Sequence, residues 1–171
     1  DAASVALDAE QVDVDVATFE RVAGEETPAA LERAGALYEG ELLLGLNVRE
    51  EPFEEWLRIE RERLRQRGIG VLTRLLHVHL AHQRAEAAVD TALRLLTVDP
   101  TQEAVHRTLM QLYARQGRRA AARRQYQICV DVLQRELGVE PESATRDVYR
   151  ELLPVAPATA PPPPRAAQAV R

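Results

Sequence analysis

The chain has 171 residues, 46% of them hydrophobic, and a formal net charge of −5. This length suits one domain, and this hydrophobic content supports a packed core. The negative charge argues against a free-standing nucleic-acid-binding protein, which usually carries a strong basic excess. The single cysteine excludes an internal disulfide and a cysteine-based zinc site.

The two ends of the chain differ from its middle. Residues 4–14 partly alternate between apolar and polar side chains, which predicts a short β hairpin, the remnant of a neighbouring domain. Residues 154–171 are rich in Pro and Ala, so we expect a disordered, extended linker. Because the chain begins at Asp1 rather than Met, we expect it to be a piece of a longer protein.

Between residues 15 and 153, apolar residues recur at steps of three and four, which is typical of amphipathic helices. The first helix is expected to begin at Asp15, whose carboxylate can accept from first-turn amides, and to end at Gly24. The second begins with Thr27 as its N-cap and Pro28 at its first position, where the missing N–H is not needed.

A loop between Gly40 and Gly45 precedes the longest helix, predicted from about Pro52 to His82. The leucines in and beside this loop are expected to fold back onto the core: Leu42, Leu43, Leu44 and Leu46. Trp56 belongs to the apolar stripe of the long helix. Gly68 and Gly70 weaken its middle by about 1 kcal/mol each relative to alanine, which indicates a bend or break there. Further helices are expected at residues 84–98, 101–117, 118–137 and from Pro141 onward.

A shift of 34 residues places similar residues on one another. The pairs are Leu75 with Leu109, His79 with Tyr113, Ala88 with Ala122, Ala92 with Tyr126, and Leu95 with Cys129. This is the spacing of the two-helix tetratricopeptide unit, which buries its apolar face only by stacking on neighbours. Two such units are clear, so the first two helices or the last must complete the stack. We therefore predict an all-α fold, a tetratricopeptide-like stack of antiparallel helix pairs.

Several stretches form one combined pattern: Leu37-Tyr38-Glu39-Gly40-Glu41-Leu42-Leu43, Phe53-Glu54-Glu55-Trp56-Leu57, Asp99-Pro100-Thr101-Gln102-Glu103-Ala104-Val105-His106-Arg107, and Glu136-Leu137-Gly138-Val139-Glu140-Pro141. In this pattern residues 13–153 resemble the bacterial transcriptional activator domain. That domain follows the winged-helix DNA-binding domain in Streptomyces antibiotic regulatory proteins and related regulators. The resemblance implies a tetratricopeptide-like fold and a role in transcription regulation.

The resemblance also implies a domain organisation. Residues 1–14 would be the end of a preceding winged-helix domain, residues 15–153 the helical activator domain, and residues 154–171 a linker to whatever follows. The helix that reads DNA in the winged domain is not in this chain. DNA contact is therefore expected only through that missing domain.

Five residues are candidates for a partner-facing groove, because the first helix of each stacked unit lines the concave face. They are Thr73, His77, Arg107, Gln111 and Arg115. The simpler interpretation is an ordinary solvated face. A second cluster comprises Arg115, Arg118, Arg119, Arg123 and Arg124. It could contact phosphate, but helix capping and solvation are the simpler explanation.

No pattern points to catalysis, a cofactor or a metal. His77 and His79 diverge by about 200° on a helix, which disfavours a shared metal ion. Cys129 lies on a core stripe, as a structural cysteine does. The sequence has no Gly-rich phosphate loop and no nucleophile motif. We expect a protein that is not an enzyme.

Together these features predict a non-catalytic regulatory and interaction module of a bacterial transcriptional regulator. It would pack on its winged-helix domain through Val5–Phe19 and the first two helices, and contact protein partners or neighbouring domains of the same chain. A homodimer is compatible with this role. With no signal peptide and no apolar run of about 20 residues, we expect a cytoplasmic protein without membrane contact. The alternative is a tetratricopeptide-type scaffold with no transcriptional role, which would bind peptides in its groove.

Overall fold

The computed structural model describes residue 12 and residues 14–153, and these form helices but no strand. The helices are α1 (Asp15–Ala23), α2 (Pro28–Leu37), α3 (Glu51–Ala81), α4 (Ala85–Val98), α5 (Glu103–Arg115), α6 (Arg119–Leu137) and α7 (Ser143–Leu152). The linker predicted at 154–171 lies outside the described residues, as does the hairpin predicted at 4–14 apart from Val12 and Val14.

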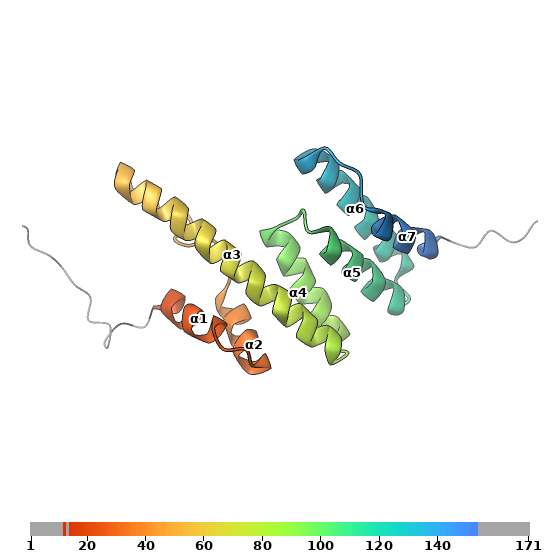
Figure 1. The fold of residues 1–171 in the computed structure, drawn as a ribbon, viewed down its shortest axis with the longest axis horizontal. Helices are drawn as coiled ribbons and strands as arrows, with labels where there is room; N and C mark the ends of the chain where they lie inside the picture. Colours follow the sequence, from red (N-terminus) through yellow and green to blue (C-terminus); the bar gives the residue numbers. More distant parts are fainter. Residues whose placement is uncertain (1–11, 13, 154–171) are drawn as a thin grey trace, which may run out of the picture.

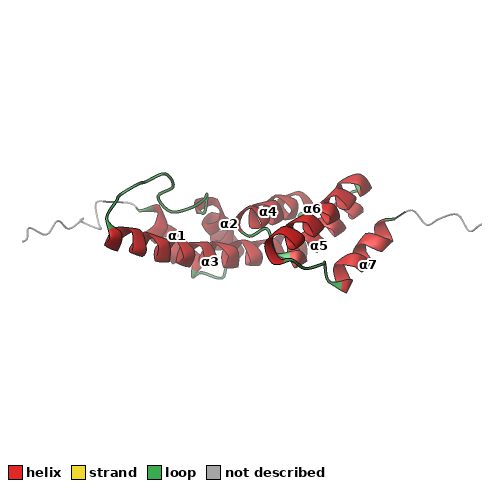
Figure 2. Cartoon of the chain, turned by 90° about the horizontal axis from the view of Figure 1, so that it is seen from above, coloured by secondary structure: helices red, strands yellow, loops and turns green. Residues whose placement is uncertain are grey.

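Consecutive helices pack in pairs, and the pairs lie side by side along the molecule (Figure 1). α1 packs on α2, α3 on α4, and α5 on α6, while α2 on α3 and α4 on α5 join one pair to the next. α7 covers the last pair through contacts with both α5 and α6, and Figure 2 shows it at the end of the row from above. The all-α tetratricopeptide-like stack is confirmed, with helices on both sides completing it.

The 34-residue repeat is a repeat of structure. The backbone N–H of Arg84 donates to the carbonyl of His79 at 2.9 Å, and the N–H of Arg118, 34 positions later, donates to that of Tyr113 at 2.8 Å. The residues that the shift superimposes are buried in both units, except for the half-buried Tyr126. Equivalent turns therefore join the two helices of each unit.

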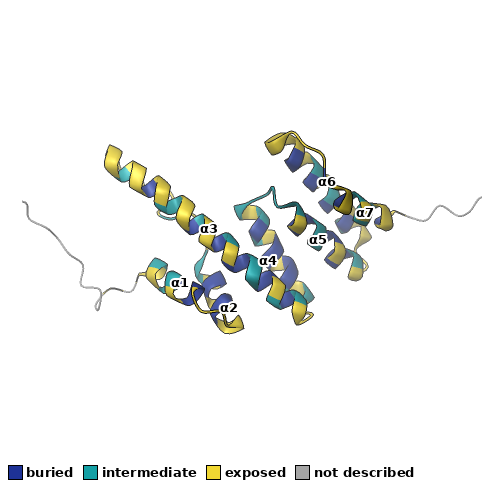
Figure 3. Cartoon of the chain, in the orientation of Figure 1, coloured by how far each residue is buried: buried dark blue, intermediate teal, exposed yellow. Residues whose placement is uncertain are grey.

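Two clusters of buried apolar side chains form the core. One joins α1 and α2 to α3, and the other runs from α3 to α7. Helix α3 serves both, because Leu64, Val71 and Leu75 belong to the first cluster whereas Leu72 and Leu76 belong to the second. Figure 3 shows the matching pattern of buried faces between the helices, with exposed residues along the first half of α3.

Helix α3 is one uninterrupted helix, so the break expected around Gly68 and Gly70 is wrong. Gly68 is buried against Tyr38, at the end of α2, and a Cβ there would lie 2.5 Å from the ring. Gly70 faces open space. The glycine at position 68 thus allows close helix packing, and the contacts on both sides of α3 outweigh its low helix propensity.

The starts of the first two helices differ from each other. At α2 the Oγ1 of Thr27 accepts from the N–H of Ala30 at 3.2 Å, with Pro28 as the first helical residue, which confirms the predicted cap. At α1, Val14 is the N-cap and makes no side-chain hydrogen bond, and the helix begins at Asp15, as predicted. The Asp15 carboxylate accepts from a first-turn amide, the N–H of Val16, at 2.7 Å, which confirms the predicted acceptor.

Candidate interaction surfaces

The five predicted groove residues lie on two helices that both pack against α4. Thr73 and His77 are on α3, and Arg107, Gln111 and Arg115 are on α5. His77, Gln111 and Arg115 are exposed, and Thr73 is half-buried. The exposed members remain available to a partner.

Arg107 has a partner within the chain. Its guanidinium donates to the Oγ1 of Thr145, a fully buried residue of α7, at 3.0 Å and lies 3.7 Å from the carboxylate of Glu142. Glu103 of α5 adds a second link, because its carboxylate accepts from the backbone N–H of Glu142 at 2.7 Å. Arg107 therefore connects α5 to α7.

An open cavity of about 1040 Å³ lies between the α2–α3 loop, the first half of α3 and the end of α4. Its apolar lining includes Tyr38, Leu42, Leu57, Leu64, Leu72 and Val98. The sequence did not predict it, because the wall from the end of α4 lies far along the chain from the walls formed by the α2–α3 loop and α3. The only local signal is the run of alternating arginines and glutamates at 58–65.

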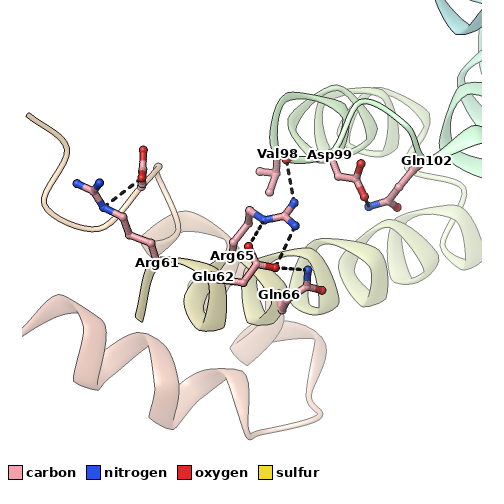
Figure 4. Close-up of polar contacts among 8 residues, drawn as sticks. Arg61, Glu62, Arg65, Gln66, Val98, Asp99 and Gln102 are labelled. Atoms are coloured by element: carbon pink, nitrogen blue, oxygen red, sulfur yellow. Dashed lines mark hydrogen bonds and ion pairs between the residues drawn. The ribbon is translucent and has the colours of Figure 1, made fainter. Parts of the chain in front are cut away.

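Arginines hold the polar rim of this cavity in place (Figure 4). Arg61 lies 3.1 Å from the carboxylate of Glu41, and its Nε donates to the carbonyl of Leu42 at 2.9 Å. Arg65 donates to Glu62 at 2.9 Å, and Gln66 donates to the same carboxylate at 2.8 Å. These hydrogen bonds, that from Arg65 first, lower the pKa of Glu62 to about 2. Glu62 is thus held as an anion and is unsuited to proton transfer near neutral pH.

Apolar side chains are exposed beside the cavity, contrary to the sequence-based expectation. Leu44 is 78% exposed, Leu43 and Leu46 are also exposed, and only Leu42 packs on the core. Arg61 explains the difference, because it binds the carbonyls of both Leu42 and Leu43 and holds the loop by its backbone. Trp56, predicted on the apolar stripe of α3, is 48% exposed.

The five clustered arginines lie around the turn between α5 and α6, and all are exposed. The guanidinium of Arg118 lies 4.8 Å from the centre of the Tyr113 ring and donates to the side chain of Gln116. We call Arg115, Arg118, Arg119, Arg123 and Arg124 the basic surface.

The cysteine and the two neighbouring histidines of α3 differ in their burial. Cys129 is buried, and burial raises the pKa of its thiol to about 11, so it is a protonated core residue near neutral pH. His77 is exposed whereas His79 is buried. Among the residues that the structure describes, no three His, Cys, Asp or Glu side chains form a metal site. No helix within that part of the chain is long and apolar enough to cross a membrane.

Comparison with known proteins agrees with the geometry. Residues 8–153 match the family model described as the bacterial transcriptional activator domain. No curated protein and no solved structure matches the chain.

Proposed function

Because the chain belongs to the bacterial transcriptional activator domain family, we propose that it couples a winged-helix DNA-binding domain to partner proteins or downstream domains. The family has a role in bacterial transcriptional activation and is a regulatory family rather than an enzyme family. In this proposal the chain acts by binding and by positioning its neighbours.

The observation that carries the proposal is the alignment of α1 with α3. Glu20 of α1 pairs with Arg63, and the carbonyl of Ala23 accepts from Arg74 at 3.0 Å. Residue numbers rise together along both helices, so the two run in roughly the same direction. The N-terminal end of α1, at Val14, therefore points toward the first half of α3.

A domain preceding α1 would emerge beside exposed apolar side chains. Val14 is 44% exposed, and Trp56 and Ile59 on α3 are exposed as well. Full burial of one such side chain contributes about 1.5–3 kcal/mol, so a few of them suffice to hold a neighbouring domain. Phe19, which the sequence suggested for this contact, is buried inside the helical unit, 5.8 Å from the ring of Tyr38. The proposed interface uses Val14, Trp56 and Ile59 instead.

Trp56 provides the test, because it is the only tryptophan of the chain. The chain alone is compared with the same chain joined to the winged-helix domain that this proposal places before it. Any tryptophan of the added domain is replaced by phenylalanine, so that Trp56 is the only tryptophan fluorophore observed. We expect a blue-shifted emission and weaker iodide quenching in the joined protein, since Trp56 becomes buried.

The matched control is Leu93→Trp in a Trp56→Phe background, which places the fluorophore at another exposed apolar position, on α4. Its emission should be the same with and without the winged-helix domain. Unchanged emission of Trp56 in the joined protein would remove the proposed interface.

The alternative, a peptide-binding scaffold, is supported by the exposure of Gln111 and Arg115 on α5. Partner capture by Arg115→Glu and Gln111→Glu variants separates the two functions. If these variants no longer capture a partner while Trp56 is still buried in the joined protein, partner binding is assigned to α5. We avoid Arg107→Glu for this purpose, because Arg107 holds α7.

A further inference from the structure

Positive charge is concentrated in one part of this acidic chain. Between Glu103 and Asp131 the sequence has six arginines and no aspartate or glutamate, although the whole chain has 27 acidic residues. One of the six, Arg107, faces α7. The other five are the basic surface, so the rest of the molecule is more acidic than its net charge of −5 suggests.

The basic surface lacks the carboxylate partners that several exposed arginines have elsewhere. Arg58 pairs with Glu55 at 2.7 Å, and Arg84 pairs with Glu32 at 2.7 Å. On the basic surface only Arg118 has a hydrogen bond, to the neutral side chain of Gln116. No carboxylate within the described residues lies within ion-pair distance of the five guanidinium groups.

Helix stabilisation does not account for these arginines. Arg115 lies in the last turn of α5, where a cation is favourable. Arg119 begins α6, whose first turn has no acidic residue and whose N-cap makes no side-chain hydrogen bond, so its charge opposes the helix dipole. Arg119 and Arg123 are also four residues apart on one helix face, where like charges destabilise by a few tenths of a kcal/mol. The helix-capping explanation therefore fits Arg115 alone.

We propose that the basic surface binds the phosphate backbone of double-stranded DNA without reading its sequence, a DNA contact in addition to the one expected through a winged-helix domain. Guanidinium groups match phosphate in charge and in hydrogen-bond geometry, and phosphate contacts position a protein on DNA without specifying bases. Gly117 and Ala120, between the arginines, are small and exposed, so neither adds bulk beside the guanidinium groups.

The choice of DNA rests on the proposed function, since a module attached to a winged-helix domain is held beside the duplex. The charge distribution adds an orientation. Because the rest of the chain is acidic, repulsion turns its other faces away from DNA and leaves the α5–α6 turn facing the backbone. The basic surface thus fixes how the module sits on the promoter while the winged helix supplies the sequence.

The test measures binding of the 171-residue chain alone to a fluorescein-labelled duplex of arbitrary sequence, by fluorescence anisotropy at low salt. The variant Arg119→Gln/Arg123→Gln/Arg124→Gln should bind at least about tenfold more weakly than the wild type, because three phosphate contacts are lost. Five phosphate contacts predict a wild-type slope of log K against log salt of up to about −4.5, and the loss of three of them should make the variant slope shallower by about 2.7 units.

The matched control is Arg21→Gln/Arg135→Gln/Arg150→Gln, which removes three exposed arginines outside the basic surface and gives the same net charge. Its affinity and salt slope should stay close to those of the wild type, and circular dichroism should show equal helicity in all three proteins. Equal weakening in the two triple variants, or no wild-type binding at low salt, overturns the proposal.

A competition arm separates DNA from an acidic protein partner. Polyglutamate at equal charge concentration should displace the duplex poorly, and equal displacement would assign the basic surface to an acidic polypeptide instead. These measurements use no winged-helix domain. Absence of DNA binding by the chain alone therefore does not affect the Trp56 fluorescence test of the proposed function. Unchanged Trp56 fluorescence likewise does not affect the DNA-binding measurement.

Discussion

Gln83 and Gly117 occupy the same turn position in successive units, 34 residues apart, and both have left-handed backbone, with φ of 56° and 74°. The turn geometry is therefore set by the repeat and not by the residue type. An L-amino acid in this conformation costs about 1–2 kcal/mol, and glycine avoids that cost. The first unit retains the strain that the second avoids.

Exchanging these residues should change stability in opposite directions. Gly117→Gln should lower the free energy of unfolding by about 1 kcal/mol, and Gln83→Gly should raise it by about 0.5 kcal/mol after the entropy of the unfolded glycine is included. Urea unfolding followed by circular dichroism measures both. If both substitutions shift the midpoint in the same direction, the two turns are not equivalent.

Gly68→Ala and Gly70→Ala should differ in sign, although both lie within α3. A Cβ at position 68 would lie 2.5 Å from the ring of Tyr38, so overpacking of about 1–3 kcal/mol outweighs the helix propensity gained. A Cβ at position 70 meets nothing within 4 Å, so Gly70→Ala should stabilise by roughly 0.5–1 kcal/mol. Thermal unfolding of the two variants provides the comparison, and stabilisation by both would mean that Tyr38 moves aside freely.

Arg94→Met should lower stability by about 1–3 kcal/mol, because it leaves two carbonyls without their donor. The guanidinium of Arg94 donates to the carbonyls of Gly35 and Tyr38, at 2.5 and 2.9 Å, where α2 ends beside the cavity. Arg124→Met is the control, since the structure gives the Arg124 side chain no hydrogen bond, and it should change unfolding by less than about 0.5 kcal/mol. Equal urea midpoints for the two variants would show that water replaces Arg94 at no cost.

Acidification should destabilise the protein through His106. This buried imidazole contacts the carbonyl of Pro100 through Nε2 at 2.9 Å and Gln125 through Nδ1 at 2.7 Å, so a neutral ring that donates to Pro100 and accepts from Gln125 satisfies both. Burial lowers the pKa of His106 below its ordinary 6.5, with Pro100 and Glu103 acting in the opposite direction.

The sign follows from proton linkage. The unfolded chain takes up a proton at His106 as the pH falls below 6.5 while the folded chain still resists it, so stability present above that pH is lost below it. The loss is at most about 1.4 kcal/mol per pH unit. Urea unfolding at about pH 7.5 and 5.5 should show a smaller difference for His106→Gln than for the wild type, whereas exposed His77→Gln should match the wild type. Equal pH differences in the wild type and His106→Gln would exclude His106 as the titrating group.

The sequence predicted what depends on local periodicity. Leu109 and Ala122 are buried as their 34-residue partners are, and Thr27 caps α2, because short-range spacing decides which helix face is apolar and where a helix begins. It failed where distant segments decide the outcome. Leu44 and Trp56 are apolar yet exposed, and the cavity beside them depends on how Arg61 and Arg94 hold remote carbonyls.

In the candidate sites, too, local features were predicted from the sequence and long-range contacts were not. The sequence identified the basic surface, because charge clustering is visible in the chain itself. It could not show that Arg107 is occupied by Thr145 while its neighbours on the α5–α6 turn have no carboxylate partner. That distinction depends on where α7 packs, which no local pattern records.

Val71 and Leu72 are adjacent in the chain, yet they belong to different core clusters on different sides of α3. Rolling this helix about its own axis would improve packing on one side only by opening gaps on the other, and close-packed interiors resist such gaps. Because α3 packs tightly on both sides, a displacement of α1 should tilt or shift α3 as a whole instead of rotating it. We therefore expect the α1–α2 pair and the repeats packed on the other side of α3 to move together as one rigid body.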